Sequence, residues 1–207
     1  MDENVFETAY GGRAARGSAI AATPWEIGRA QPVVEELYGF GAFSGHVLDA
    51  GCGTGENALF LAAQGHKVTG VDVAPSAVET ARRKAAERGL SADFTVADAT
   101  RSLGDDGSVD TALDCGLLHS LRPEHRAGYL AALHRVCRPE ALAHVLCFSD
   151  RVRFDFAGGP RLFDEPTVRG VFGPDWALVH LETATLTALF PGGERDLPCW
   201  LATARRS

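Results

Sequence analysis

The stretch Val47-Leu-Asp-Ala-Gly-Cys-Gly-Thr-Gly55 decides the fold of this chain. The run His46–Ala50 predicts a short buried strand, and Glu56–Gln64 predicts a helix directly after the glycines. Glycines at alternate positions let the backbone turn sharply and approach a ligand closely, because a Cβ atom there would obstruct it. The first turn of the helix adds N–H groups that have no intrahelical partner. A tight turn without a ligand is the alternative, but we predict a loop that binds a nucleoside-type ligand, a dinucleotide included.

Strands and helices alternate from this stretch to about residue 150. The helix that Pro75 opens ends at Gly89, which matches the preference for proline at the start and glycine at the end of a helix. Alternation at this spacing is typical of βαβ units and predicts an α/β fold with a mostly parallel sheet. The further predicted strands are 67–72, 92–97, 109–115 and 141–149, and the predicted helices are 75–88 and 123–137.

The two flanks of this region follow other patterns. The N-terminal flank has a weak helical pattern over Asp2–Arg16 and a helix over Pro32–Tyr38, which we interpret as a cap on the sheet edge. The C-terminal flank holds a long loop, 151–163, then a helix, Glu165–Val171, and two strands, Trp176–Thr183 and Pro198–Arg205. We predict one domain in three parts: an N-terminal cap (1–45), a cofactor-binding core (46–150), and an acceptor-side loop with C-terminal strands (151–207).

Three carboxylates narrow the choice of ligand. Asp72 ends the second strand, 21 residues after Gly51 (72 − 51 = 21), where it would face ribose hydroxyls. Asp49 precedes the glycines and would repel a pyrophosphate, whereas a ligand with an ammonium group would favour it. S-adenosylmethionine carries an ammonium group and a sulfonium, and it has no phosphate. Asp98 ends the third strand, where it either contacts an adenine amino group or caps the next turn.

Composition excludes several functional classes. The chain has 207 residues and a net charge of −7, which argues against general nucleic-acid binding. Its five cysteines are odd in number and form no C-x-x-C pair, so we expect buried thiols in a reducing compartment and no zinc site. The acidic N-terminus lacks the apolar run of a secretory signal, and no window approaches the ~18 apolar residues of a membrane span. We therefore expect a cytoplasmic protein that binds no membrane.

The chain resembles the class I S-adenosylmethionine-dependent methyltransferases. Asp49–Gly55 matches their first motif, Val71-Asp72 their ribose position and Ala97-Asp98-Ala99 their adenine position. The resemblance implies a Rossmann-like, seven-stranded, mostly parallel sheet with a reversed last strand, helices on both faces, and S-adenosylmethionine as cofactor with S-adenosylhomocysteine as product. The cofactor-binding residues that we expect are Trp25, Arg29, Asp49, Gly51, Cys52, Gly53, Gly55, Asn57, Asp72, Val73, Asp98, Ala99 and Cys115.

The segment Thr23-Pro-Trp-Glu-Ile-Gly-Arg29 narrows the resemblance. It is similar to the Thr-Pro-Trp-Asp-x-Gly element of the thiopurine and halide/thiol methyltransferase-like group, which includes bacterial heterocyclic-toxin methyltransferases; Glu26 replaces the usual Asp. The resemblance implies a small, often aromatic acceptor methylated on S, N, O or halide. It also implies that Trp25 packs near the methionine portion of the cofactor and Arg29 near its carboxylate, although Trp25 could also only anchor the segment.

The acceptor side is less determined. His119 follows the fourth strand and is the candidate general base; the alternatives are a histidine that borders the sulfonium and one that is hydrogen-bonded to the backbone. Asp114 is a second candidate, for contact with the acceptor or with the amino group of the cofactor, and capping the strand is the alternative. We expect no catalytic metal. The predicted acceptor-binding residues are Tyr10, Arg151, Arg153, Phe154, Phe156 and Phe163.

Two other functions remain open from the residues alone. A nicotinamide-dependent oxidoreductase on a similar sheet is disfavoured by Asp49 and by Glu56, which stands where a third dinucleotide-loop glycine would be. A catalytically inert, cofactor-binding partner subunit is disfavoured by the complete cofactor set. The expected partner is a small-molecule acceptor, on a protein that is a monomer or homodimer.

Overall fold

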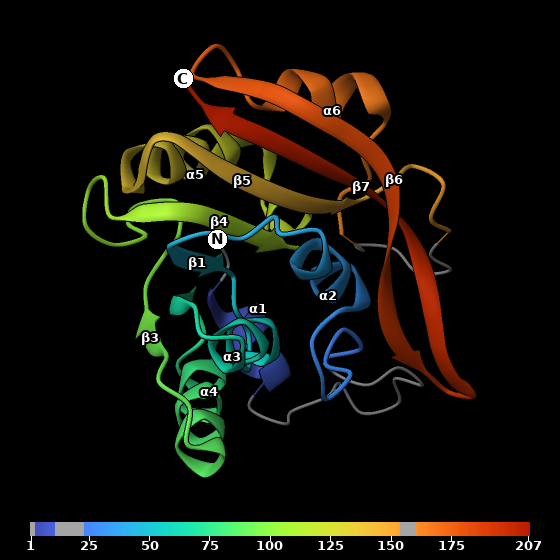
Figure 1. Ribbon diagram of the computed structural model, residues 1–207. Coiled ribbons are helices and arrows are strands. Elements are labelled where there is room, and N and C mark those ends of the chain that lie inside the picture. The colour runs from blue at the N-terminus through green and yellow to red at the C-terminus, as the bar shows by residue number, and fades with distance from the viewer. Residues whose placement is uncertain (1–2, 11–22, 154–159) are drawn as a thin grey trace.

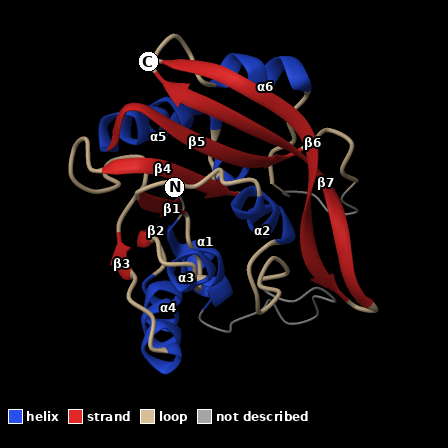
Figure 2. Ribbon diagram, in the orientation of Figure 1, coloured by secondary structure: helices blue, strands red, loops and turns tan. Residues whose placement is uncertain are grey.

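A seven-stranded sheet with the order β3-β2-β1-β4-β5-β7-β6 organises the molecule (Figures 1 and 2). The computed structural model describes residues 3–10, 23–153 and 160–207. Strand β7 runs antiparallel to both of its neighbours, and the other neighbouring strands pair in parallel. The predicted mostly parallel sheet with a reversed last strand is therefore confirmed. The strands are β1 (His46–Ala50), β2 (Lys67–Asp72), β3 (Asp93–Val96), β4 (Val109–Cys115), β5 (Cys137–Phe148), β6 (Trp176–Phe190) and β7 (Gly193–Arg206).

Helices cover both faces of this sheet, as predicted. One apolar cluster includes Leu59 of α3 and Val78 of α4, and the other includes Leu133 of α5 and Val168 of α6. Burial of these two clusters is the main force that holds the layers together. The helices are α1 (Glu3–Tyr10), α2 (Pro32–Gly39), α3 (Glu56–Ala63), α4 (Pro75–Arg88), α5 (Pro123–Val136) and α6 (Glu165–Val171), with a short 3₁₀ helix, η1 (Leu118–Ser120).

The last two strands are longer than their sequence predicts. Strands β6 and β7 form a long hairpin of 15 and 14 residues that bends away from the sheet (Figure 1). Much of the first half of β6 is exposed, so it lacks the apolar pattern that marks a buried strand. Strand β5 likewise starts earlier, at Cys137, and residues 138–140 that follow are exposed. Of the predicted helix Asp2–Arg16, residues 11–16 lie outside the described part of the chain.

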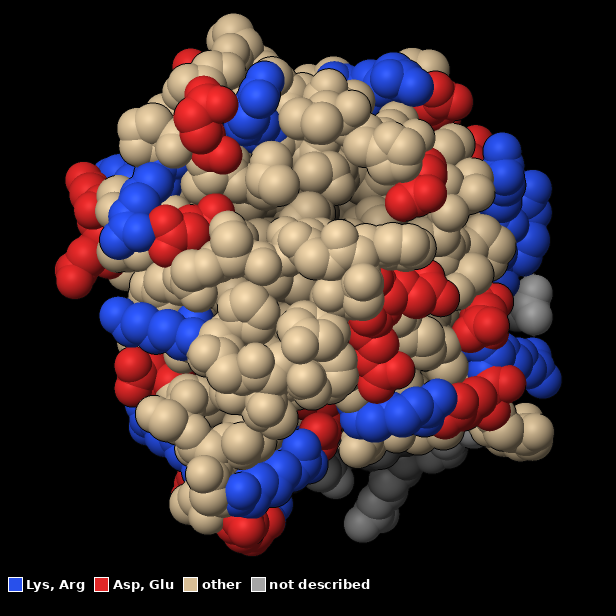
Figure 3. Space-filling model, in the orientation of Figure 1, with Lys and Arg blue, Asp and Glu red and all other residues tan. Residues whose placement is uncertain are grey.

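The surface charges and the cysteine thiols are arranged as the composition predicts. On the face in Figure 3, acidic and basic side chains are interspersed. Four of the five cysteines are buried, Cys115 is half-buried, and all five are free thiols. Among the helices that the structure describes, none has the length and apolarity needed to cross a bilayer.

Candidate functional site

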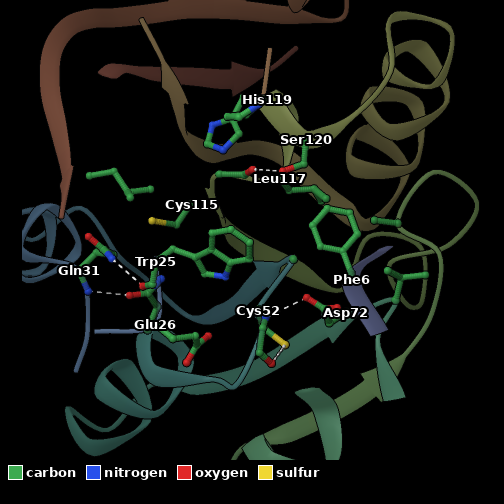
Figure 4. A pocket seen from close by; sticks show the side chains of 18 of the residues that line it. Phe6, Trp25, Glu26, Gln31, Cys52, Asp72, Cys115, Leu117, His119 and Ser120 are labelled. Atoms are coloured by element: carbon green, nitrogen blue, oxygen red, sulfur yellow. Dashed lines mark hydrogen bonds between the residues drawn. The ribbon is translucent and has the colours of Figure 1, made fainter. Parts of the chain in front are cut away.

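A cavity of about 650 Å³ opens at the carboxyl ends of β1, β2 and β4. The strand order reverses between β1 and β4, and open α/β sheets bind their ligands at such a point. Helix α1 and the segment Thr23–Gln31 form its outer wall. Figure 4 shows two ends. The glycine-loop end contains Glu26, Gly51, Cys52, Gly53 and Asp72, and the histidine end contains Leu117, His119, Ser120 and Phe148. Trp25 and Phe6 lie between them in this view.

The glycines of the loop are required by their conformation and their neighbours. Gly51 has φ +75° and Gly53 has φ +52°, a region that favours glycine. A Cβ on Gly51 would stand 2.9 Å from the Leu117 Cβ, and one on Gly53 would stand 2.6 Å from the Tyr10 hydroxyl. The backbone of the glycine loop therefore lies against Leu117 at one position and against Tyr10 at the other, with no space for a side chain at either.

Asp49 is a buried carboxylate with an unused acceptor. Its side chain is 1% exposed, and among the described residues Oδ2 has no hydrogen-bond partner. Burial, followed by the charges of Asp72, Asp114 and Glu26, raises the pKa of Asp49 to about 7. Asp49 does not itself belong to the cavity wall, but it lies beneath the loop that does. An ammonium group near this loop would supply the missing charge, so the site fits S-adenosylmethionine.

Asp72 fixes the loop from the neighbouring strand. Its Oδ2 accepts a hydrogen bond from the Gly53 N–H (2.9 Å), and its Oδ1 accepts one from the Ala74 N–H (2.9 Å). Its carboxylate lines the cavity, as a ribose-binding group should. Cys52, Asn57, Val73, Ala99 and Cys115, all predicted from the sequence, also line it.

Glu26 is a residue whose role the sequence did not reveal. It accepts hydrogen bonds from the Thr54 N–H (3.3 Å) and from the Thr54 hydroxyl, and so ties the N-terminal cap to the glycine loop. Together with Asp49 and Asp72, it makes this end of the cavity acidic, which disfavours a pyrophosphate. The only available signal was its place in the Thr-Pro-Trp-Glu element.

Gln31 holds the other side of the cap. Its Nε2 donates to the carbonyl oxygens of Trp25 (3.2 Å) and Thr187 (3.0 Å), and its Oε1 accepts from the Thr187 N–H (2.9 Å). Its backbone N–H donates to the Asn57 Oδ1 (2.9 Å). Gln31 thus connects the cap to β6 through its buried side chain and to α3 through its backbone N–H, a role that the sequence alone does not reveal.

Trp25 and Tyr10 meet at the outer wall. The Trp25 Nε1–H donates to the Tyr10 hydroxyl (2.9 Å), and the rings pack edge to face. Trp25 lines the cavity as predicted, while Tyr10 lies over Gly53, at the glycine-loop end, instead of beside the histidine. Arg29 also reaches the wall, but its guanidinium forms a bidentate ion pair with Glu194 (2.6 and 2.8 Å).

His119 is buried at the other end and is uncharged. Its ring stacks on Phe148 at 4.1 Å, and its Nδ1 accepts a hydrogen bond from the Phe148 N–H (3.2 Å). Burial lowers the pKa of His119 to about 3. The neutral ring therefore carries its proton on Nε2, which lies near Gly116 in the cavity wall. His119 can donate a hydrogen bond there, but it has no free nitrogen to accept a proton.

Four residues that we predicted for the acceptor side do not line the cavity, and for Asp114 the structure agrees with the capping alternative. Asp114 is buried outside the cavity wall and accepts from the Leu117 N–H (2.7 Å) and the Tyr129 hydroxyl (2.8 Å), so it holds η1 in place. Phe163 is fully buried in the core. Arg151 stacks over Trp200, and Arg153 donates to backbone carbonyls. The contacts of Arg151 with Trp200 and of Asp114 with Tyr129 join distant parts of the chain, so local sequence cannot show them.

The remaining predicted residues have different outcomes. The Asp98 carboxylate accepts from the N–H and hydroxyl of Thr100 (2.9 and 2.7 Å) and does not line the cavity, which supports the capping alternative. Gly55 begins α3 in the left-handed conformation. Phe154 and Phe156 lie outside the described residues. Within the described part of the chain, no group of three or more His, Cys, Asp or Glu side chains could hold a metal ion.

Comparison with known proteins agrees with this geometry. A family model for a methyltransferase domain matches residues 47–140. A 2-heptyl-1-hydroxyquinolin-4(1H)-one methyltransferase of Mycobacteroides abscessus is 38% identical over 187 residues, which span 90% of this chain and 82% of that protein.

Solved structures give the same result. One from a study of the conversion of a disulfide bond into a thioacetal group during echinomycin biosynthesis is 36% identical with a TM-score of 0.90, over 100% of this chain and 93% of the other. The fold is shared with a Burkholderia thailandensis 1,6-didemethyltoxoflavin-N1-methyltransferase (TM-score 0.68, 23% identity, 99% of this chain and 88% of the other). The chain belongs to the S-adenosylmethionine-dependent methyltransferases.

Proposed function

We propose that this enzyme methylates an oxygen atom of a small hydroxylated nitrogen heterocycle, which reaches the cavity as its oxyanion. The state of His119 carries the proposal: it is neutral, and its Nδ1 already accepts the Phe148 N–H. A histidine in this state does not remove a proton from the acceptor. Heterocycles with an acidic hydroxyl, such as the hydroxyquinolinone in the name of the M. abscessus relative, lose that proton in water.

The glycine-loop end would hold the cofactor. When bound, S-adenosylmethionine supplies a methyl group that its sulfonium has already activated. Asp49 would compensate the ammonium group, Asp72 would bind the ribose hydroxyls, and Trp25 would offer an aromatic face to the positive charge. These residues position the cofactor and take no part in proton transfer.

The histidine end would hold the acceptor. Phe6, Leu117, Phe148 and Leu186 give the cavity apolar walls that a flat ring can fill while water is excluded. The His119 Nε2–H would donate a hydrogen bond to the acceptor oxygen and orient it toward the methyl group. An acceptor that arrives as an oxyanion becomes a neutral ether, so no proton has to leave the active site.

The proposal is tested with three matched acceptors. The enzyme and S-adenosylmethionine are incubated with 1-hydroxyquinolin-4(1H)-one, quinolin-4-amine and quinoline-4-thiol, and the methylated products are identified by mass spectrometry. We expect the N-methoxy product from the first acceptor and slower or no transfer to nitrogen and sulfur. Preferred transfer to the thiol or the amine would overturn the choice of oxygen. Absence of all three products, with S-adenosylhomocysteine bound, would overturn the acceptor class.

We also propose that the enzyme works in a reducing compartment such as the cytoplasm, which the five free thiols support. The prediction of a monomer or homodimer stays a prediction, and so does the absence of nucleic-acid binding. Size-exclusion chromatography with light scattering would measure the oligomeric state directly.

A further inference from the structure

Three arginines gather beside the histidine end of the cavity. Arg122 and Arg161 line the cavity and are exposed, so they lie at its opening. Arg126 is one turn after Arg122 on α5, and its guanidinium lies 4.4 Å from the ring centroid of Phe163. The Arg161 N–H donates to the carbonyl oxygen of His119 (2.8 Å), which places this residue next to the histidine.

These arginines lack the partners that most other arginines have. No carboxylate of the described residues forms an ion pair with any of the three, and the buried Nε of Arg126 has no hydrogen-bond partner there. Burial, and then the charge of Arg161, lower the pKa of the Arg126 guanidinium. By contrast, carboxylates pair with Arg29, Arg83, Arg88, Arg101, Arg135, Arg138, Arg169 and Arg205.

The cavity is therefore electrically polarised. Glu26 and Asp72 lie at the glycine-loop end in Figure 4, and Asp49 is buried just before that loop, whereas Arg122 and Arg161 line the cavity beside the histidine end. Within the described part of the chain no carboxylate pairs with these like charges, which costs free energy in a chain whose net charge is −7. A cationic cofactor complements the first end, and an anionic ligand complements the second.

We propose that Arg122 and Arg161, with Arg126 behind them, bind a carboxylate substituent of the acceptor at the cavity opening. The inference rests on the proposed function for the acceptor's place in the cavity, and it adds a charged group remote from the oxygen that is methylated. Guanidinium groups bind carboxylates through paired N–H donors, which gives direction as well as attraction. The carboxylate would hold the acceptor by its outer edge while His119 holds the reacting edge.

The test compares ligands of equal shape and different charge. Calorimetry on the complex with S-adenosylhomocysteine measures the Kd of 4-hydroxyquinoline-2-carboxylate and its 3-carboxylate isomer against the two matching carboxamides. We expect at least one carboxylate to bind about 10- to 100-fold more tightly than its amide, the range of a charge-assisted hydrogen bond. This preference should shrink at high salt, because exposed charges are screened.

Variants locate the preference on the protein. The double variant Arg122→Gln/Arg161→Gln should bind acid and amide equally, and Arg122→Lys/Arg161→Lys should keep part of the preference. The matched control is Arg135→Gln, on the same helix but paired with Asp106 away from the cavity, which should behave as wild type. If the double variant does not fold, Arg161→Gln alone is used, because this residue lies outside the helices.

Two results would overturn the inference: no preference for either carboxylate in the wild type, or a preference that survives in the Gln variants. Failure of the proposed function looks different. Carboxylates that bind in an arginine-dependent way but are never methylated would leave the anion site standing and remove the acceptor chemistry. Methylation of neutral acceptors without any carboxylate preference would support the proposed function and overturn the anion site.

Discussion

The two ends of the cavity are built in different ways. The glycine-loop end comes mainly from one strand, loop and helix, with Asp72 on the neighbouring strand β2 and Glu26 from the N-terminal cap. The histidine end takes residues from η1, the end of β5, residues 160–161 and β6, and Phe6 of α1 lies between the two ends. The first end is acidic and the second carries a neutral histidine and three arginines. Recognition of a shared cofactor is thus local in sequence, whereas recognition of a particular acceptor depends on tertiary packing.

The largest expected effect tests how strictly the glycine-loop end depends on its backbone. In Gly51→Ala the new Cβ meets Leu117 and also sits in a left-handed conformation, which costs about 1–2 kcal/mol for an L-residue. We expect the affinity for S-adenosylhomocysteine to fall more than about 100-fold. A displaced glycine loop would lose contacts with the ligand whose free energy is about that of two hydrogen bonds. Calorimetry measures this loss.

Gly65→Ala is the control for this variant. Gly65 has φ +91°, and nothing lies within 4 Å of an added Cβ, so it carries the same backbone cost without the clash. Its unfolding midpoint should fall while cofactor affinity stays within about twofold. Equal affinity loss in both variants would mean that general destabilisation, and not the loop, explains the result.

Asp49→Asn is expected to raise the free energy of unfolding and to weaken cofactor binding. The folded protein holds the Asp49 proton up to about pH 7, whereas the unfolded chain releases it near the ordinary value of 3.8. Between these values the folded state binds more protons, so wild-type stability falls as pH rises. Above pH 7 the Asn variant should be more stable by about 2–4 kcal/mol in urea unfolding.

The same variant should bind the cofactor less well. Loss of the charge facing the ammonium group should weaken S-adenosylhomocysteine binding about 10- to 100-fold. In the wild type, binding should weaken as pH falls below about 7, and the Asn variant should lack this dependence. If Asp49→Asn lowers stability at pH 8 and leaves affinity unchanged, Asp49 is not the partner of the ammonium group.

The histidine end should respond to hydrogen-bond donors and not to pH. At saturating cofactor, and with an acceptor ionised throughout, kcat should be constant from about pH 5.5 to 8, because burial holds the pKa of His119 at about 3. His119→Phe should lower kcat about 10- to 100-fold, and His119→Asn, which keeps a donor, should lose less. A fall in kcat below about pH 6.5 that is absent in His119→Asn would contradict this prediction and would show that His119 acts as the general base.

The contrast between the two ends explains what the sequence could predict. Asp49, Gly51 and Asp72 follow from strand ends and spacing, and the structure brings their segments together as expected. Phe163 and Arg151 were wrong because a single aromatic or arginine in a loop carries no information about whether it faces a core or a cavity. Arg122 and Arg161 are separated by 39 residues (161 − 122 = 39), and only the folded chain, in which the Arg161 N–H binds the His119 carbonyl, brings both to one cavity.

The smallest expected effect tests whether Arg29 belongs to the glycine-loop end and binds the cofactor. The resemblance places Arg29 near the cofactor carboxylate, but its guanidinium is engaged by both Glu194 oxygens on the hairpin of β6 and β7. Both partners are well exposed, so their pairing is weak in water and contributes little to folding. We expect Arg29→Gln to change S-adenosylhomocysteine affinity less than about threefold, within the range of one exposed ion pair. Glu194→Gln, measured alongside, should have as small an effect. A loss of about tenfold or more in Arg29→Gln alone would show that Arg29 leaves Glu194 when the cofactor binds, and the glycine-loop end would then include Arg29 beside Glu26 from the cap.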